Sequence, residues 1–389
     1  MHHYLFVNAN FDRCVICEMA KFLKTVYNAH KNLKIAVVSM TFCIFSYNVY
    51  QTINIFKMER NEYERITEKL EFIESGQNCT MPTAKGILSC KQIEADVYKK
   101  FGYRLIDYKL PIPTVKRTIS QTCDEVFSEW LSVALTHDEK FKPISEIPPN
   151  LWNDFTMNNH SVVENWYFDS RSPNEDISWN GTEIKIKVKS HPLSTTNYGD
   201  QGGAVHWATL LHSVNDLTGI VIGSYTSWVE TICLRNGAKK VYTVDYHKII
   251  SNHPQHSFYH ALEMAKRWKQ FFEKIDFVVT FSSLEHSGLG RYGDPIDPFG
   301  DIREVQKMRC LLKQGGLLHL GIPTGQDALI FNAHRVYGRL RLAMLFEGFQ
   351  LIDAFLGNFR YSFPMSANIF EDKIDLSKTE QIVYVLKKI

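Results

Sequence analysis

Ionisable side chains and turn-forming residues gather in one stretch of the chain, "SSLEHSGLGRYGDPIDPFGD" (282–301). This stretch directly follows "IDFVVTF" (275–281), an apolar run typical of a buried strand. Its His286 has an ordinary pKa of about 6.5, so it could act as a general base at neutral pH. Glu285 could orient the imidazole, and Arg291 could hold a carboxylate, a phosphate or a sugar hydroxyl. The stretch is therefore a candidate catalytic loop.

Three aspartates in the same loop add further chemistry. Asp294 or Asp297 could also orient His286, and together with Asp301 they could bind a divalent cation through oxygen atoms. Their spacing matches no metal-binding loop motif, so we predict no metal site. The alternative is a rigid structural loop in which Arg291 pairs with an aspartate and His286 caps the strand.

The elements that must position this loop form a regular pattern from residue 201 onward. Apolar runs typical of strands alternate with stretches typical of amphipathic helices, which predicts a parallel α/β sheet. The predicted strands are 219–224, 240–246, 275–281, 317–323, 349–356 and 381–388, and the predicted helices are 204–214, 226–237, 257–274, 302–313 and 338–348. No helix separates the last two strands, which predicts a terminal antiparallel hairpin. Arg335 and Arg339 are most simply interpreted as part of a solvated helix face.

The first strand ends in a turn that could bind a polar ligand. Gly223 and Ser224 lie between this strand and the next helix, whose N-terminus presents backbone N–H groups and a positive dipole end. Asp245 ends the neighbouring strand 22 residues after Gly223. In dinucleotide-binding folds an acid about 20 residues past the glycine turn accepts hydrogen bonds from ribose hydroxyls. The spacing therefore favours a ligand site at this rim.

The sequence of residues 1–200 predicts an organisation different from that of the α/β sheet. After a tail (1–34), residues 35–56 contain no charged side chain and are long enough for a single transmembrane helix. Polar residues in the second half of that segment leave a buried helix as the alternative. Residues 57–200 resemble an irregular stem with a small accessory region, including a charged helix at 57–76 and an edge strand at 183–190. We expect the domain that follows to span 201–389.

Features of this first part bear on localisation. A cytosolic N-terminus would place the rest of the chain in the lumen of the endoplasmic reticulum or Golgi apparatus, although the basic residues flanking the anchor do not decide its orientation. Cys79, Cys90 and Cys123 could form disulfides in such an oxidising compartment. Three N-x-[ST] sequons begin at Asn78, Asn159 and Asn180. The formal net charge is only +2 and no strongly basic block occurs, so nucleic acid is not an expected partner.

The order of elements resembles the class I S-adenosylmethionine-dependent methyltransferase fold. The glycine turn, the acid after the second strand, "IDFVVTFSSLEH", "LLKQGGLLHLGIP" and the terminal hairpin carry this resemblance over residues 203–389. It implies a doubly wound, mostly parallel seven-stranded sheet and S-adenosylmethionine as the cofactor. The residues expected to contact the cofactor are Gly223, Ser224, Glu230, Asp245 and Ser282. The superfamily's first motif is altered, because Val221 replaces its acid and Tyr225 and Ser227 replace two glycines.

The motifs "GSYTSWVE", "SSLEHSGLGRYGDPIDPFGD" and "FNAHRVYGRLR" more narrowly resemble a nematode-abundant family defined as a domain of unknown function. The methyltransferase resemblance implies that His286 removes the proton of an acceptor hydroxyl, with Glu285, Arg291 and Asp294 completing the catalytic set. The acceptor would be a small molecule or, given the expected lumenal location, a glycan. The alternatives are a non-catalytic binding or scaffold protein of the same fold and, less favoured, a nicotinamide-dependent enzyme. The acceptor and the oligomeric state are not predicted.

Overall fold

The computed structural model describes residues 79–108, 111–136, 142–171, 176–365, 367–370 and 380–389. These residues lie within one compact unit, Ile73–Ile389. The membrane helix predicted at 35–56 and the helix predicted at 57–76 lie outside the described residues. Within the described ranges, no helix combines the length and the apolar composition needed to cross a bilayer.

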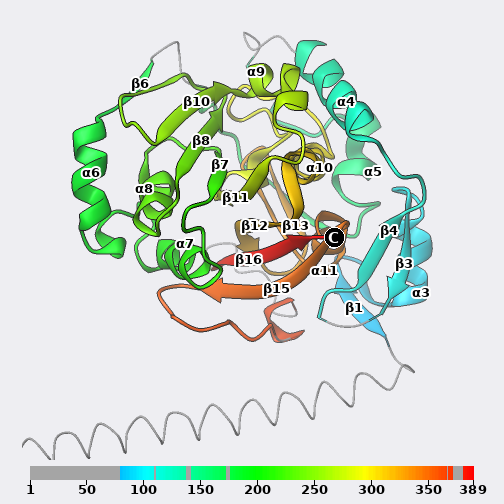
Figure 1. Cartoon of the computed structure of the whole chain (residues 1–389). Helices are drawn as coiled ribbons and strands as arrows, with labels where there is room; N and C mark the ends of the chain where they lie inside the picture. Colours follow the sequence, from blue (N-terminus) through cyan, green and yellow to red (C-terminus); the bar gives the residue numbers. More distant parts are fainter. Residues whose placement is uncertain (1–78, 109–110, 137–141, 172–175, 366, 371–379) are drawn as a thin grey trace, which may run out of the picture. The chain divides into compact units, whose positions relative to one another are not determined.

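A seven-stranded sheet forms the centre of this unit (Figure 1). Its order is β10-β8-β7-β11-β12-β16-β15, and only β16 runs antiparallel to its neighbours. The strands are β7 (Thr218–Ile222), β8 (Lys240–Asp245), β10 (His256–His260), β11 (Ile275–Phe281), β12 (Leu312–Thr324), β15 (Phe349–Leu356) and β16 (Glu380–Lys388). The predicted mostly parallel, doubly wound sheet with a terminal hairpin is confirmed.

Helices cover both faces of this sheet, as the strand sequences require. In β7 and β11 successive apolar side chains point to opposite faces, so both faces must be shielded from water. One face packs against α7 (Asp200–Leu211) and α8 (Trp228–Arg235), and the other against α9 (Ala261–Lys266), α10 (Gly300–Leu311) and α11 (Arg339–Leu345). Two large apolar cores result, one on each side of the sheet.

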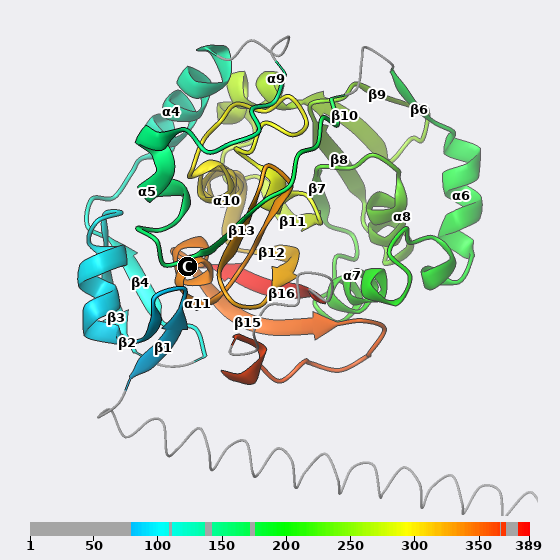
Figure 2. The ribbon, with the colours of Figure 1, turned by 180° about the vertical axis from the view of Figure 1, so that it is seen from behind.

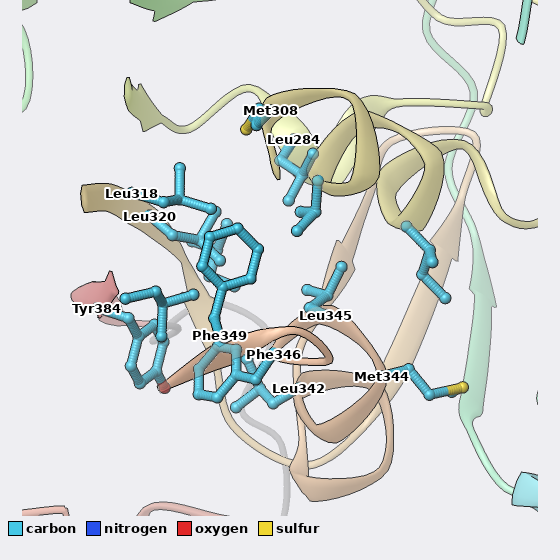
Figure 3. Close-up of a cluster of buried hydrophobic side chains, with 14 of the residues drawn as sticks. Leu284, Met308, Leu318, Leu320, Leu342, Met344, Leu345, Phe346, Phe349 and Tyr384 are labelled. Atoms are coloured by element: carbon cyan, nitrogen blue, oxygen red, sulfur yellow. The ribbon is translucent and has the colours of Figure 1, made fainter. Parts of the chain in front are cut away.

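Figure 3 shows part of the core that lies between the sheet, α10 and α11. Side chains from β12, β15, β16, α10 and α11 meet there with Leu284, the first residue of the short turn that begins the candidate loop. The labelled members are Leu284, Met308, Leu318, Leu320, Leu342, Met344, Leu345, Phe346, Phe349 and Tyr384. The candidate loop is therefore anchored in the main core at its start.

The residues before position 200 form small elements that pack on the sheet domain. They are β1 (Thr80–Thr83), β2 (Gly86–Ser89), α3 (Cys90–Ile93), β3 (Tyr103–Asp107), β4 (Thr114–Arg117), α4 (Cys123–Thr136), α5 (Trp152–Phe155), β5 (Val162–Asn165), β6 (Ile177–Trp179) and α6 (Gly181–Lys189). Two of them pair with strands of the later region. β5 joins β13 (Ala328–Phe331) and β14 (His334–Val336) in a three-stranded sheet, and β6 pairs with β9 (Ile249–Ser251). Figure 2 shows the chain leaving β5 across the side that carries β13.

Two disulfides stabilise this region. Cys79 pairs with Cys90, and Cys123 at the start of α4 pairs with Cys310 near the end of α10. The sequence marked the first three cysteines as pairing candidates but did not single out Cys310. The second bond joins positions 187 residues apart and fixes α4 against the sheet domain.

The strand predicted at 183–190 is wrong, because these residues form α6. The side chain of Asn180 caps the helix by accepting a hydrogen bond from the Thr182 N–H over 2.9 Å. Glu183 and Lys187 form an i,i+4 ion pair on its surface. Ile184 is buried in the core that contains α8, so packing outweighs the alternating pattern.

The helix predicted at 257–274 is only partly correct. Its first residues form β10, the edge strand that pairs in parallel with β8, and α9 begins at Ala261. A hydrophobic pattern alone does not separate a short edge strand from the first turns of a helix. Gly315 and Gly316 also do not end a helix, because β12 already begins at Leu312.

Candidate functional site

A cavity of about 280 Å³ lies at the carboxyl ends of β7, β8 and β11. Its wall includes Gly223, Asp245, Ser282 and His286, which come from three neighbouring strand exits. In open α/β sheets this rim is where ligands bind. The structure therefore brings together the residues that the sequence marked at separate strand ends.

The turn after β7 is built around one glycine. Gly223 has φ +72° and donates its N–H to the carbonyl oxygen of Val244 over 3.0 Å. A Cβ at this position would collide with the side chain of Ser283, so only glycine fits. Tyr225 and Ser227, which replace the glycines of the superfamily motif, are not among the described residues with positive φ. Tyr225 is 71% exposed, so its side chain does not fill the turn.

Asp245 holds this turn to the end of β8. Its Oδ2 accepts a hydrogen bond from the Ser224 N–H over 2.9 Å, and its Oδ1 accepts one from the His247 N–H over 2.7 Å. The His247 Nδ1 also lies 3.1 Å from Oδ1; since a carboxylate offers about four acceptor positions, these three contacts still leave capacity for a ligand. The orientation of the Asp245 carboxylate at the cavity wall is thus fixed by the backbone on both sides.

Glu230 lies beneath the turn and is not part of the cavity wall. Its Oε2 accepts a hydrogen bond from the Ser224 hydroxyl over 3.0 Å, and its Oε1 accepts one from the Thr243 hydroxyl over 2.6 Å. Burial raises its pKa to about 7. The geometry therefore corrects the expectation of direct cofactor contact: Glu230 positions the turn through Ser224.

His286 faces the cavity in a neutral form. Its Nδ1 lies 2.6 Å from the carbonyl oxygen of Ala333, which can only accept, so Nδ1 carries the hydrogen and Nε2 is unprotonated. Burial lowers its pKa to about 3, so the expected pKa near 6.5 is wrong. The predicted orientation by Glu285, Asp294 or Asp297 is also wrong, since the Ala333 carbonyl orients the ring.

Glu285 is almost fully buried beside the cavity wall. Its Oε1 accepts a hydrogen bond from the Gln381 amide over 3.4 Å and lies 3.9 Å from His286 Nε2. Its Oε2 has no hydrogen-bond partner among the described residues. Burial raises the pKa of the carboxyl to about 7. Glu285 therefore changes protonation state near neutral pH, and His286 does not.

Ser282 is strained at the exit of β11. It has φ +51°, a conformation that non-glycine residues rarely adopt, and its N–H donates to the carbonyl oxygen of Gly321 over 3.1 Å. The Gln381 amide donates to its hydroxyl over 3.4 Å. Such backbone strain is maintained only where the surroundings fix it, and it is common at functional sites.

The rest of the loop is held by backbone hydrogen bonds. Asp294 lines the cavity, but its Oδ2 accepts from the N–H groups of Gly288 (2.7 Å) and Gly290 (3.1 Å), and its Oδ1 from that of Tyr292 (3.2 Å). Burial raises its pKa. The carboxylate thus closes the glycine-rich turn through backbone hydrogen bonds, and not through the pairing with Arg291 that the alternative interpretation assumed.

Arg291 does not line the cavity. Its guanidinium stacks on the rings of Phe168, at 4.5 Å, and Tyr292, at 5.0 Å, and its Nε donates to the Ser170 hydroxyl over 3.2 Å. The predicted aspartate partner is therefore wrong. Arg291 fixes the segment after β5 against the loop beside the cavity.

Two buried arginines support the loop from below. Arg335 donates to the carbonyl oxygen of Ser287 over 2.6 Å, and Arg341 to that of Pro298 over 2.6 Å. Arg341 also pairs with the fully buried Asp301, its Nη2 lying 2.6 Å from Oδ1. Arg335 and Arg339 are both buried, so their expected place on a solvated helix face is wrong.

The loop aspartates considered as metal ligands have other partners. Asp301 pairs with Arg341, and Asp297 pairs with Arg303 over 2.8 Å. In the part of the chain that the structure describes, no group of three histidine, cysteine or acidic side chains is arranged to bind a metal ion.

Sequence reasoning missed the cavity wall formed by α4. Phe127, Trp130 and Val133 line the cavity. The indole of Trp130 donates to Glu304 Oε1 over 2.8 Å, and its ring lies 3.4 Å from the Lys307 ammonium. No local pattern predicts this contact, because Trp130 and Glu304 are 174 residues apart in the chain. Only the pairing of Cys123 with Cys310 would have indicated it.

The part of the chain that carries the sheet can be compared with known families. Residues 216–389 match a family described as "Caenorhabditis protein of unknown function, DUF268". The match covers the sheet from β7 onward and includes Gly223, Asp245 and His286. It confirms the resemblance to a nematode family of unknown function, and the sheet order agrees with a methyltransferase-like fold.

Solved structures similar to this chain include two methyltransferases. The 1,6-didemethyltoxoflavin-N1-methyltransferase of Burkholderia thailandensis, with 1,6-didemethyltoxoflavin and S-adenosylhomocysteine bound, is 15% identical, with a TM-score of 0.36 and coverage of 58% of this chain and 99% of that chain. The N-methyltransferase NodS of Bradyrhizobium japonicum WM9, in complex with S-adenosylhomocysteine, is 14% identical, with a TM-score of 0.31 and coverage of 54% and 97%. A comparison with curated proteins finds no match.

Proposed function

We propose that this protein is an S-adenosylmethionine-dependent methyltransferase that acts on a hydroxyl group. One observation carries the proposal: the Gly223 turn, the Asp245 carboxylate and the exit loop with Ser282 and His286 line a single cavity. This cavity lies at the rim where doubly wound sheets bind ligands.

The residues of the cavity fit this cofactor. Asp245 keeps acceptor capacity for ribose hydroxyls, and the turn at Gly223 and Ser224 lines the cavity beside it, where the methionine end would bind. Ala261 and Met264 supply apolar surface for a base. When bound, S-adenosylmethionine supplies an electrophilic methyl group. The altered glycine motif leaves the cavity open, because Tyr225 lines the cavity but remains 71% exposed.

The site needs a base that can accept the proton of the acceptor hydroxyl near neutral pH. His286 is too weak a base at its lowered pKa, but its unprotonated Nε2 can accept a hydrogen bond and orient the hydroxyl. The hydroxyl proton then passes through Nε2 to the neighbouring Glu285, whose Oε1 lies 3.9 Å from Nε2 and whose pKa is about 7. We therefore assign orientation to His286 and proton acceptance to Glu285.

A glycan in the secretory lumen is the acceptor we propose. The two disulfides favour an oxidising compartment. Exposed aromatic rings that follow β5 also lie close to the cavity: Phe168 stacks on Arg291, and Arg291 stacks on Tyr292, which lines the cavity. Tyr292 combines an apolar ring with a polar hydroxyl, which suits a sugar surface. A membrane anchor at 35–56, with the sheet domain in the lumen, completes this proposal.

Calorimetric titration of the full-length protein with S-adenosylhomocysteine tests the cofactor assignment. We expect binding, and Asp245→Ala should weaken it roughly 10- to 100-fold, because charged hydrogen bonds each contribute about 1.5–3 kcal/mol. Asp176→Ala, which removes an exposed carboxylate paired with Lys248, is the matched control and should bind normally. No heat at millimolar ligand, or equal binding by both variants, would exclude the assignment.

A non-catalytic protein of the same fold is the second candidate. The replacement of the acid and two glycines in the first motif favours it, as does the weak basicity of His286. In that case His286→Ala and Glu285→Gln should both leave the function in the organism intact. Loss of function with normal protein levels in either variant would contradict this second candidate.

A further inference from the structure

Two N-x-[ST] sequons lie within the described residues and play no part in the cavity. Asn159 belongs to the turn between α5 and β5, and Asn180 is the N-cap of α6. Both asparagines are exposed, and neither lines the cavity. A group attached to either side chain would therefore project into solvent and leave the cavity open.

The side-chain amides of both asparagines are held in a similar way. Asn159 Oδ1 accepts a hydrogen bond from the Trp152 indole over 2.7 Å, and Asn180 Oδ1 accepts one from the Thr182 N–H over 2.9 Å. Among the described residues, no hydrogen bond engages Nδ2 of either side chain. The oxygen of each amide is thus fixed by the protein, while the nitrogen remains available for attachment. For comparison, Asn158 donates its Nδ2 to the Asp96 carbonyl over 3.1 Å.

The disulfides supply an independent observation. Four of the five cysteines in the described ranges are paired, and the fifth, Cys233, is fully buried. Disulfides form and persist in secreted proteins and in the lumen of the endoplasmic reticulum, and they are rare in the cytosol. N-linked glycosylation of exposed N-x-[ST] sequons takes place in the same lumen.

We propose that Asn159 and Asn180 carry N-linked glycans. In this reaction a lipid-linked oligosaccharide pyrophosphate donates its glycan. The bond between the sugar carbon and the phosphate oxygen breaks, a carbon–nitrogen bond forms to Nδ2, and Nδ2 loses one proton. The lipid pyrophosphate is the leaving group. On Asn180 the glycan leaves the helix cap intact, since the cap uses Oδ1 alone.

The full-length protein, expressed in eukaryotic cells that glycosylate secretory proteins, provides the test. Expression in an Asn78→Gln background removes the third sequon, whose asparagine lies outside the described residues. We expect digestion with peptide-N-glycosidase F to increase gel mobility by two steps. Digestion in heavy-oxygen water should convert Asn159 and Asn180 to labelled aspartates, identified by peptide mass spectrometry.

Substitutions of the serine or threonine in each sequon distinguish a loss of glycosylation from a loss of folding. Ser161→Ala and Thr182→Ala should each remove one mobility step while retaining the asparagine and its hydrogen bond. Ser161→Thr and Thr182→Ser keep the sequon and should retain both steps. The Cys123–Cys310 bond, mapped in the same samples, reports correct folding. The proposal is overturned if the glycosidase does not change the mobility of the protein, or if both alanine variants still show two mobility steps. Either result counts whether or not the Cys123–Cys310 bond has formed.

Discussion

His286 donates its Nδ1 hydrogen to the carbonyl oxygen of Ala333 over 2.6 Å, from a loop to a residue 47 positions later in the chain. This bond fixes both the tautomer and the plane of the imidazole. Because the ring is also buried, the pKa of His286 falls from 6.5 to about 3. A residue that sequence analysis interprets as a titrating base is thus a permanently neutral one at physiological pH.

This difference predicts a dependence of stability on pH. Below pH 6.5 the unfolded chain protonates His286 and the folded chain does not, so the free energy of unfolding falls as the pH decreases. His286→Asn retains an N–H donor but does not titrate. Between pH 6.5 and pH 5 the variant should lose about 2 kcal/mol less than the wild type, since each pKa unit corresponds to about 1.4 kcal/mol. Urea denaturation at both pH values measures this, and an equal loss in both proteins would contradict the lowered pKa of His286.

Glu285 predicts the opposite trend. Burial raises its pKa from 4.5 to about 7, so the folded state binds its proton more tightly than the unfolded state does. The stability that this group contributes is complete below pH 4.5 and is lost as the pH rises through 7. Glu285→Gln should therefore become more stable relative to the wild type between pH 5 and pH 8. Thermal denaturation across this range provides the measurement, and parallel curves would show that the carboxyl is not protonated in the folded protein.

The sequence predicted six of the seven strands of the sheet because each of these six is a local apolar run with turn residues at its ends; the edge strand β10 was not predicted. Gly223, Asp245 and Ser282 could be placed at one rim because parallel strands end on the same side. The incorrect predictions concern side chains whose contacts are made by residues distant in the chain. The Ala333 carbonyl that orients His286 has no side-chain signature, and the burial that lowers its pKa depends on the whole fold. The helix at 181–189 was not predicted because apolar and basic residues alternate there, as they do in a strand. This alternation was given more weight than the capping residue Asn180.

Gly223 should tolerate no side chain. Its φ of +72° disfavours other residues by about 1–2 kcal/mol, and a Cβ would also collide with Ser283. We expect Gly223→Ala to lower both stability and the affinity for S-adenosylhomocysteine, and Gly223→Ala/Ser283→Ala to recover part of each. Gly86 has φ +99° with no neighbouring atom within 4 Å, so Gly86→Ala controls for backbone strain alone. Equal effects of the two single variants in calorimetry and thermal denaturation would contradict the close approach of Ser283.

The Cys123–Cys310 disulfide should support both stability and the cavity. Because it closes a long loop, its removal by Cys123→Ala/Cys310→Ala is expected to cost about 2–5 kcal/mol. Ligand affinity should fall as well, since α4 supplies Phe127 and Trp130 to the cavity wall. Cys79→Ala/Cys90→Ala removes a bond that closes only a short segment outside that wall, and it should leave affinity unchanged. Unaltered affinity in the first double variant would show that α4 does not shape the binding site.

Arg335 and Arg341 hold the loop at the cavity through the carbonyl oxygens of Ser287 and Pro298, and every amino acid possesses such an oxygen. The path of the loop therefore depends little on the identity of its outward-facing side chains. Substitution of those side chains should therefore change the lining of the cavity without displacing the loop from the two arginines. The chemical character of the cavity wall and the position of the loop are thus controlled by different groups.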